Sequence, residues 1–168
     1  EYTLSDGITA WTSDGFTHGT NNRYCESSNT FASWSWKANG AGSSNTDGSI
    51  TSTVSANTTS GFSIVKFTGT GANATVGHGL GVAPKMILVK ATGTGSWIVY
   101  HKSMGATKNL LLDATNAEAT VSTMWNDTAP TSSVFSVGSN GATNGNGATM
   151  MAYCFAEKVG YSKISSYI

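Results

Sequence analysis

The amino-acid sequence predicts an all-β protein, an antiparallel β-sandwich of jelly-roll-like type built from short strands and Gly/Asn/Ser turns. Ser, Thr, Gly and Asn account for 80 of the 168 residues, and Thr favours strands while the other three favour turns. Five Trp, six Tyr and six Phe supply the large apolar side chains that a core needs. Apolar runs are short and recur every 10–15 residues or so between turn residues, which is typical of a sandwich.

Each expected strand is an apolar run bounded by turn residues. The run 62–67 ends at a Gly-Thr-Gly turn, and the glycine-interrupted run 75–81 ends before Pro84. The continuous β-branched run 86–89 predicts a central strand buried on both faces. Further strands are expected at 97–101, 110–112, 134–137 and 150–155. The stretch 113–123 has no apolar stripe, so we expect at most one short helical turn there.

The sequence repeats itself internally. When the chain is shifted by 119 residues, 9–30 falls on 128–149 without a gap, and Trp34-Ser35-Trp36 falls on Tyr153-Cys154-Phe155. A shorter echo relates Gly61-Phe-Ser-Ile to Gly160-Tyr-Ser-Lys. These registers predict one whole unit between two partial ones. The expected parts are the closing part of a preceding unit (1–38), a flexible polar connector (39–60), a complete sandwich unit (61–159) and the opening strand of a next unit or an inter-subunit strand (160–168).

The charge of the chain argues against two classes of partner. Nine basic and nine acidic residues give zero net charge, and only 11% of the residues are charged. Nucleic-acid binding and attachment to an anionic membrane both depend on clustered Lys and Arg, so we expect neither. No apolar run approaches the roughly 20 residues of a spanning helix, so membrane insertion is not expected either.

The sequence predicts no enzyme, no cofactor and no metal site. The three histidines lie in no nucleophile or metal-ligand pattern, and the nine carboxylates are scattered. We expect His78, within a glycine-rich turn, to close that turn through its ring nitrogens. Cys154 lies in an apolar stretch that favours a buried thiol, whereas Cys25 lies in a polar one. A disulfide between them stays open, because two lone cysteines do not reveal their pairing.

Two kinds of functional residue can be proposed from the sequence. Aromatic residues beside polar loop residues form candidate glycan-binding platforms: Trp97, Tyr100, His101, Trp125 and Asn126. Core packing is the alternative for each of these aromatic side chains. The end of the chain offers a candidate assembly strand that could pair with a neighbouring unit or subunit: Tyr161, Ile164, Tyr167 and Ile168.

Several separated motifs resemble a repeat of tail-fibre and other virion structural proteins of marine bacteriophages. They include His78-Gly-Leu-Gly-Val-Ala-Pro-Lys-Met-Ile, Trp125-Asn-Asp-Thr-Ala-Pro-Thr-Ser-Ser-Val-Phe and Ala152-Tyr-Cys-Phe-Ala-Glu. The resemblance implies a β-sandwich module of a virion appendage or surface, located in the virion or outside the cell. It implies association with itself, as a trimer or filament, and with other virion proteins. It carries over no catalytic residue. Recognition of host-surface glycans is the alternative function.

Overall fold

The structure is a computed structural model that describes residues 6–166, except for the side chain of residue 24. The chain forms two compact units, Glu1–Trp36 and Lys37–Ile168, called here the N-terminal unit and the C-terminal unit. Each unit is described by itself.

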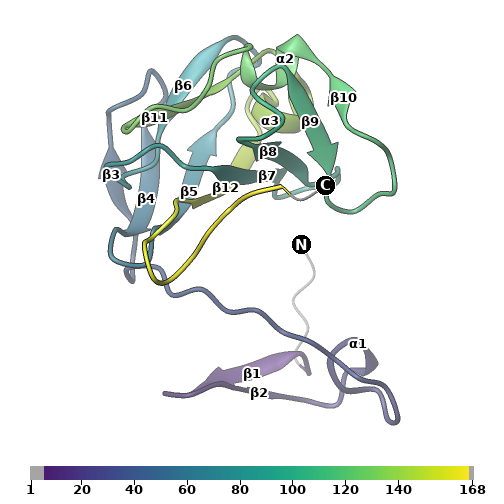
Figure 1. The fold of residues 1–168 in the computed structure, drawn as a ribbon. Coiled ribbons are helices and arrows are strands. Elements are labelled where there is room, and N and C mark those ends of the chain that lie inside the picture. Colours follow the sequence, from purple (N-terminus) through teal and green to yellow (C-terminus); the bar gives the residue numbers. More distant parts are fainter. Residues whose placement is uncertain (1–5, 167–168) are drawn as a thin grey trace. The chain divides into compact units, whose positions relative to one another are not determined.

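The C-terminal unit is built on an eight-stranded antiparallel sheet with the strand order β10-β9-β8-β7-β12-β5-β4-β3 (Figure 1). A second sheet pairs β11 with β6, and two one-turn helices follow β10 and β11. The elements are β3 (Ser43–Asn45), β4 (Ser52–Asn57), β5 (Phe62–Thr68), β6 (Ala74–Gly77), β7 (Met86–Ala91), β8 (Ile98–His101), β9 (Lys108–Leu111), β10 (Ala119–Thr120), α2 (Ser122–Trp125), β11 (Val134–Val137), α3 (Gly141–Asn144) and β12 (Thr149–Phe155). The prediction of an all-β antiparallel sandwich is confirmed.

The core lies between the two sheets, on one face of the large sheet. Successive side chains of a strand point to opposite faces, so alternate residues of β12 enter the core. Met150, Ala152 and Cys154 are fully buried there, and they are paired in register with β5 on one side and β7 on the other. From the smaller sheet, Phe135 packs edge-on against Phe67 with 6.1 Å between ring centroids. β12 is therefore the strand around which the unit is organised.

Strand β7 departs in one respect from expectation. It lies in the middle of the sheet, and Ile87 and Val89 are fully buried as predicted. Met86 and Leu88 on the opposite face are only half-buried, so the strand is not buried on both faces. The reason is that the second sheet and the helices cover the large sheet on its core face.

The expectation of a flexible connector over residues 39–60 is wrong. This stretch carries β3 and β4, and β4 pairs with β5 over six positions. Ser52 and Val54 of β4 are buried, and the Ser52 hydroxyl donates to the carbonyl of Gly77 at 3.1 Å. Backbone groups make the ladder, so a Ser/Thr-rich segment joins a sheet once its alternate side chains fit the core. The compact unit begins at Lys37 rather than near Gly61.

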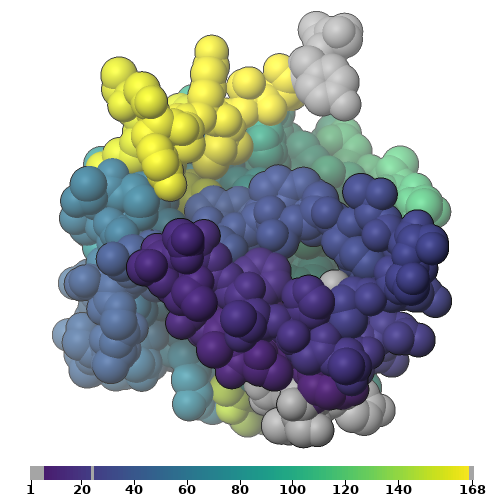
Figure 2. All heavy atoms as spheres, turned by 90° about the horizontal axis from the view of Figure 1, so that it is seen from below, coloured from purple at the N-terminus to yellow at the C-terminus, as the bar shows by residue number. Residues whose placement is uncertain are grey.

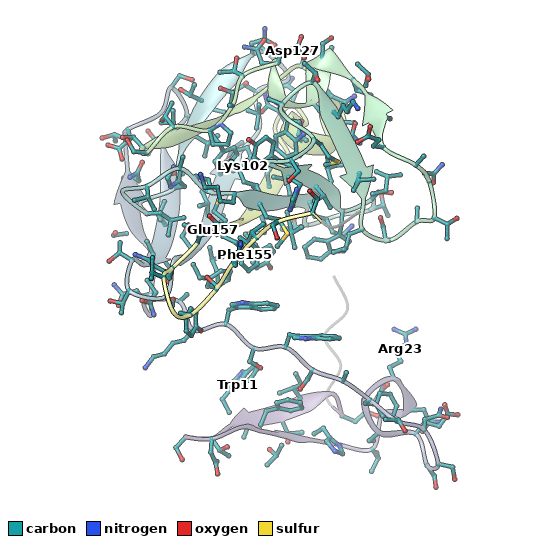
Figure 3. The ribbon with its side chains drawn as sticks, in the orientation of Figure 1. Trp11, Arg23, Lys102, Asp127, Phe155 and Glu157 are labelled. Carbon is teal, nitrogen blue, oxygen red and sulfur yellow. The ribbon has the colours of Figure 1, made fainter. Side chains whose placement is uncertain are left out.

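The N-terminal unit is small. A hairpin of β1 (Ile8–Trp11) and β2 (Phe16–His18) is followed by the single-turn helix α1 (Asn22–Cys25). Trp11 lies at the end of β1 and packs edge-on against Phe16 with 5.7 Å between ring centroids (Figure 3). Residues 27–36 continue the chain without a strand or helix.

Candidate functional site

Two of the five candidate glycan-binding residues belong to the core, so the prediction is wrong for them. Tyr100 of β8 and Trp125 of α2 are 4% and 2% exposed. Their rings pack edge-to-face with 5.8 Å between centroids. A sugar platform needs an exposed ring face, which neither side chain has. Trp125 is followed by Asn, Asp and Thr, so its sequence context indicated a loop, but helix α2 turns its side chain inward.

Asn126 has a conformational role. It follows α2 with a left-handed φ of 51°, and Asp127 continues the turn with a φ of 46°. The Thr128 hydroxyl donates to the Asn126 carbonyl at 2.7 Å. Asn and Asp tolerate the left-handed region better than other non-glycine residues, so this pair ends the helix. Asp127 marks the place of this turn in Figure 3.

Trp97 remains accessible and belongs to a small aromatic cluster. Its ring lies 5.7 Å from that of Tyr153, and the Lys90 ammonium lies 6.0 Å from the Trp97 ring centroid. The same ammonium donates to the carbonyl of Gly95. The backbone N–H of Trp97 donates to the Asp113 carboxylate at 3.2 Å. Half-buried aromatic rings beside a cation are a surface that a polar ligand can stack on.

His101 lies in a separate groove of about 780 Å³ in the C-terminal unit. The groove is lined chiefly by apolar side chains, among them Met86, Val99 and Leu110, with Glu118 also in its wall. Trp97 does not line it. The structure therefore distributes the five candidates over the core, a helix end, an aromatic cluster and a groove. They do not form one site.

His78 closes its turn as predicted. The fully buried imidazole accepts the N–H of Leu80 on Nδ1 at 3.2 Å, and Nε2 donates to the carbonyl of Thr131 at 3.2 Å. These partners require the neutral ring with its proton on Nε2. Burial lowers the pKa of His78 below 6.5, although the hydrogen bond to Thr131 and the charge of Asp47 act in the opposite direction. The residue joins two distant loops.

Both cysteines are free thiols. Cys154 is fully buried on the core face of β12, and burial raises its pKa to about 12. The Cys25 thiol donates to the carbonyl of Gly19 at 3.0 Å. Across the described part of the chain, no three His, Cys, Asp or Glu side chains gather into a set that could hold a metal ion. Within residues 6–166, the helices are all too short to cross a membrane.

The candidate assembly segment forms no strand over its described part, residues 160–166. Lys158 and Ser162 form a single antiparallel bridge, so the chain turns back on itself there. Tyr161 is 69% exposed at this turn, which projects from the surface in yellow in Figure 2. The N–H of Ile164 donates to the Glu157 carboxylate at 2.9 Å. The other two candidates, Tyr167 and Ile168, lie outside the described residues.

A closing motif recurs in both units. Helices α1 and α3 lie 119 residues apart, and each follows an asparagine, Asn21 or Asn140. Each of these asparagine side chains accepts the N–H two residues later at 3.0 Å. Three backbone N–H to carbonyl bonds also recur at this spacing: Thr12 to Gly15 and Thr131 to Val134, Cys25 to Asn21 and Asn144 to Asn140, and Asn29 to Glu26 and Ala148 to Gly145. The predicted repeat is thus a repeat of structure.

One glycine in each copy makes the motif compact. The N–H of Gly19 donates to the carbonyl of Gly7 at 2.7 Å, and the N–H of Gly138 donates to the carbonyl of Met124 at 2.9 Å. A Cβ on Gly19 would lie 2.5 Å from the carbonyl oxygen of Asp6, and one on Gly138 would lie 2.0 Å from that of Thr123. Both positions therefore require the absence of a side chain.

The copies differ at the last helical position. Asn144 is fully buried and donates from its amide to the carbonyls of Ala72 at 2.6 Å and Gly138 at 2.9 Å, while its Oδ1 accepts the N–H of Thr70 at 2.8 Å. In the N-terminal unit Cys25 takes this place. Its thiol donates to the carbonyl of Gly19, which corresponds to Gly138, and to the carbonyl of Asn21 within the same turn. Within residues 6–36, the described part of the N-terminal unit, no segment corresponds to the partner loop of residues 70–72. Sequence reasoning missed Asn144, because an Asn in a Gly/Asn-rich stretch looks like an ordinary turn residue.

A family model described as a domain of unknown function (DUF7483) matches residues 1–168. No curated protein and no solved structure matches the chain.

Proposed function

We propose that this chain, which belongs to the DUF7483 family of domains of unknown function, is a structural protein. It would form part of a phage virion appendage or surface, or of a related extracellular filament. In this role it assembles through β-rich contacts with further copies and with other virion proteins. The observation that carries the proposal is the closing motif repeated in both units, with matched backbone hydrogen bonds and asparagine caps. Proteins built from repeats of one unit form elongated assemblies, because each repeat contacts only its neighbours.

Two further features support an assembly role. The edge strands β3 and β10 of the large sheet are mostly exposed, and exposed edges offer backbone groups for pairing with another chain. The net charge is zero, and the described residues contain one ion pair, Lys108 with Glu118. Contacts between copies would therefore depend on backbone hydrogen bonds and apolar packing rather than on charge pairing.

Sedimentation velocity and negative-stain electron microscopy of the purified full chain test this role. We expect a trimer or a filament at micromolar concentration. Immunogold labelling of phage particles from the source, with an antibody against the chain, tests the location. A chain that stays monomeric at the highest soluble concentration and labels no particle would contradict the proposal.

A second candidate function, recognition of host-surface glycans, is favoured by the accessible cluster of Trp97, Tyr153 and Lys90. Trp97→Ala removes the stacking surface, so glycan binding measured on an array or by calorimetry should fall at least tenfold. Trp11→Ala removes an exposed tryptophan from the other unit and serves as the control. Equal binding by the two variants would exclude the cluster as a glycan site.

A further inference from the structure

The segment Thr30–Trp36 corresponds to strand β12. Shifted by 119 residues, its ends fall on Thr149 and Phe155, the ends of β12. The turn just before each segment is closed by the same backbone bond, from Asn29 to Glu26 in one copy and from Ala148 to Gly145 in the other. The repeated motif thus leads directly into both segments.

In the C-terminal unit, β12 is a central strand with both edges used. It pairs with β5 over seven positions and with β7 over six. Thr30–Trp36 forms no strand, and its Trp34 is 75% exposed. The same turn therefore leads to a fully paired strand in one unit and to a segment that forms no strand in the other.

The side chains of Thr30–Trp36 suit the place that β12 occupies. On the core face β12 carries one large and two small residues, Met150, Ala152 and Cys154. The matched positions carry the same order of sizes: Phe31, Ser33 and Ser35. On the opposite face, Tyr153 and Phe155 are matched by Trp34 and Trp36. A one-residue slip would reverse the two faces, so this agreement is specific to the 119-residue register.

We propose that Thr30–Trp36 is the central strand of a second sandwich unit, and that its partner is a polypeptide with the sequence pattern of residues 37–122. That pattern supplies equivalents of β5 and β7 to flank the strand and of β6 to pair with β2. The described part of the N-terminal unit begins at Asp6, whose carbonyl faces Gly19 as the carbonyl of Thr123 faces Gly138. The inference goes beyond the proposed function, since it would hold for any chain made from this repeat.

An ordinary second copy of the chain does not meet this need. Its β5 and β7 are already paired with its own β12, so Thr30–Trp36 would have to displace a strand with two complete ladders. The partner is therefore an opening half that lacks its own closing strand. This complementation is a form of β-strand addition in which alternate side chains give specificity.

Co-expression of the tagged full chain with a separate polypeptide of residues 37–122 tests the proposal. We expect the two to co-purify as a one-to-one complex, and amide hydrogen exchange at residues 31–36 to slow at least about 100-fold, as for paired central strands. Failure to co-purify, or co-purification with unprotected amides at 31–36, would overturn the proposal. Self-association of the full chain alone with protected amides there would make the partner a second copy and would also overturn it.

A pair of proline variants of the full chain shows where the polypeptide of residues 37–122, called here the probe, binds. Ser35→Pro removes a ladder N–H at the position that matches Cys154, and we expect it to abolish capture. Ala38→Pro is the matched control, because position 38 corresponds to Glu157, beyond the end of β12, and capture should persist. Capture by Ser35→Pro equal to that of the unsubstituted chain would mean that the probe exchanges with the C-terminal unit, which contradicts the proposal.

A single-chain version tests the proposal if the separate polypeptide of residues 37–122 is insoluble. Residues 37–122 are placed ahead of Glu1, and protection at 31–36 is compared with that at 150–155 in the same molecule. Protection in both segments is expected, and protection at 150–155 alone would overturn the proposal. Self-assembly of the unmodified chain is measured separately by sedimentation. The proposed structural role and this inference can therefore fail independently.

Discussion

The extent of burial distinguishes the aromatic side chains that pack in the core from those that a ligand could contact. Trp125 and Tyr100 contact each other inside the core, whereas Trp97 lies half-buried beside Tyr153 and Lys90. The four aromatic residues looked alike in the sequence, because each lies in or near a short apolar run. The distinction decides which substitutions should affect stability and which should affect binding.

Trp125→Ala should lower the free energy of unfolding by about 3–5 kcal/mol, because it empties a fully packed site. Trp97→Ala should cost about 1 kcal/mol or less, since its ring is only half-buried. Urea denaturation followed by far-ultraviolet circular dichroism measures both. Equal stability losses would contradict the assignment of Trp125 to the core.

The pKa of His78 makes stability depend on pH. Burial lowers this pKa below its ordinary value of 6.5, so the unfolded chain binds a proton more readily than the folded one. The stabilising contribution is complete above about pH 6.5 and is lost as the pH falls toward the folded-state pKa. The free energy of unfolding should therefore decline between about pH 7.5 and pH 5. His78→Gln should reduce this decline, as urea denaturation at the two pH values would show. A decline of the same size in His78→Gln would exclude His78 as its source.

At the scale of elements, the closing motif depends on close backbone approach rather than on hydrophobic content. Its glycines, asparagine caps and backbone bonds recur in both units. The motif leads from α3 into β12, and β12 pairs with β5 on one side and with β7 on the other. A defect in this short segment should therefore destabilise the whole C-terminal unit.

Gly138→Ala should destabilise the C-terminal unit by about 1–3 kcal/mol, because the added methyl group meets the Thr123 backbone. Gly93→Ala is the matched control: a Cβ there has no neighbour within 4 Å, so the change should stay within about 0.5 kcal/mol. Thermal denaturation distinguishes the two. If the Gly138→Ala protein were as stable as the control, the motif would not depend on the close approach of the Gly138 and Thr123 backbones.

The turn at Lys158–Ser162 places two apolar side chains, Val159 and Tyr161, on the surface. If this turn takes part in assembly, replacing both with Ser should weaken self-association measured by sedimentation at least tenfold without changing the melting temperature. Lys163→Ser, at an exposed neighbouring position, is the control. Unchanged association of the double variant would remove this turn from the interface.

For the whole molecule, the near absence of charge pairing implies weak dependence on salt. The described residues contain one ion pair, which is partly exposed, and exposed pairs contribute little. Raising sodium chloride from about 0.05 to 1 M should change the free energy of unfolding by less than about 1 kcal/mol. It should also leave any oligomer intact in sedimentation experiments. Dissociation at high salt would indicate an ionic interface and would contradict the proposed mode of assembly.

The all-β class, the 119-residue repeat and the turn closed by His78 could be predicted from the sequence, because strand alternation, turn residues and repeat registers are local patterns. Prediction from the sequence failed for residues 39–60, where sparse apolar residues concealed β3 and β4, and for Trp125, Tyr100 and Asn144. These features depend on tertiary contacts, since burial is set by the distant segments that cover a side chain. A Ser/Thr-rich strand is stable when β5 completes its ladder, and Asn144 has its role because residues 70–72 surround its amide. For Thr30–Trp36, the same dependence on a distant partner is what the complementation experiment measures.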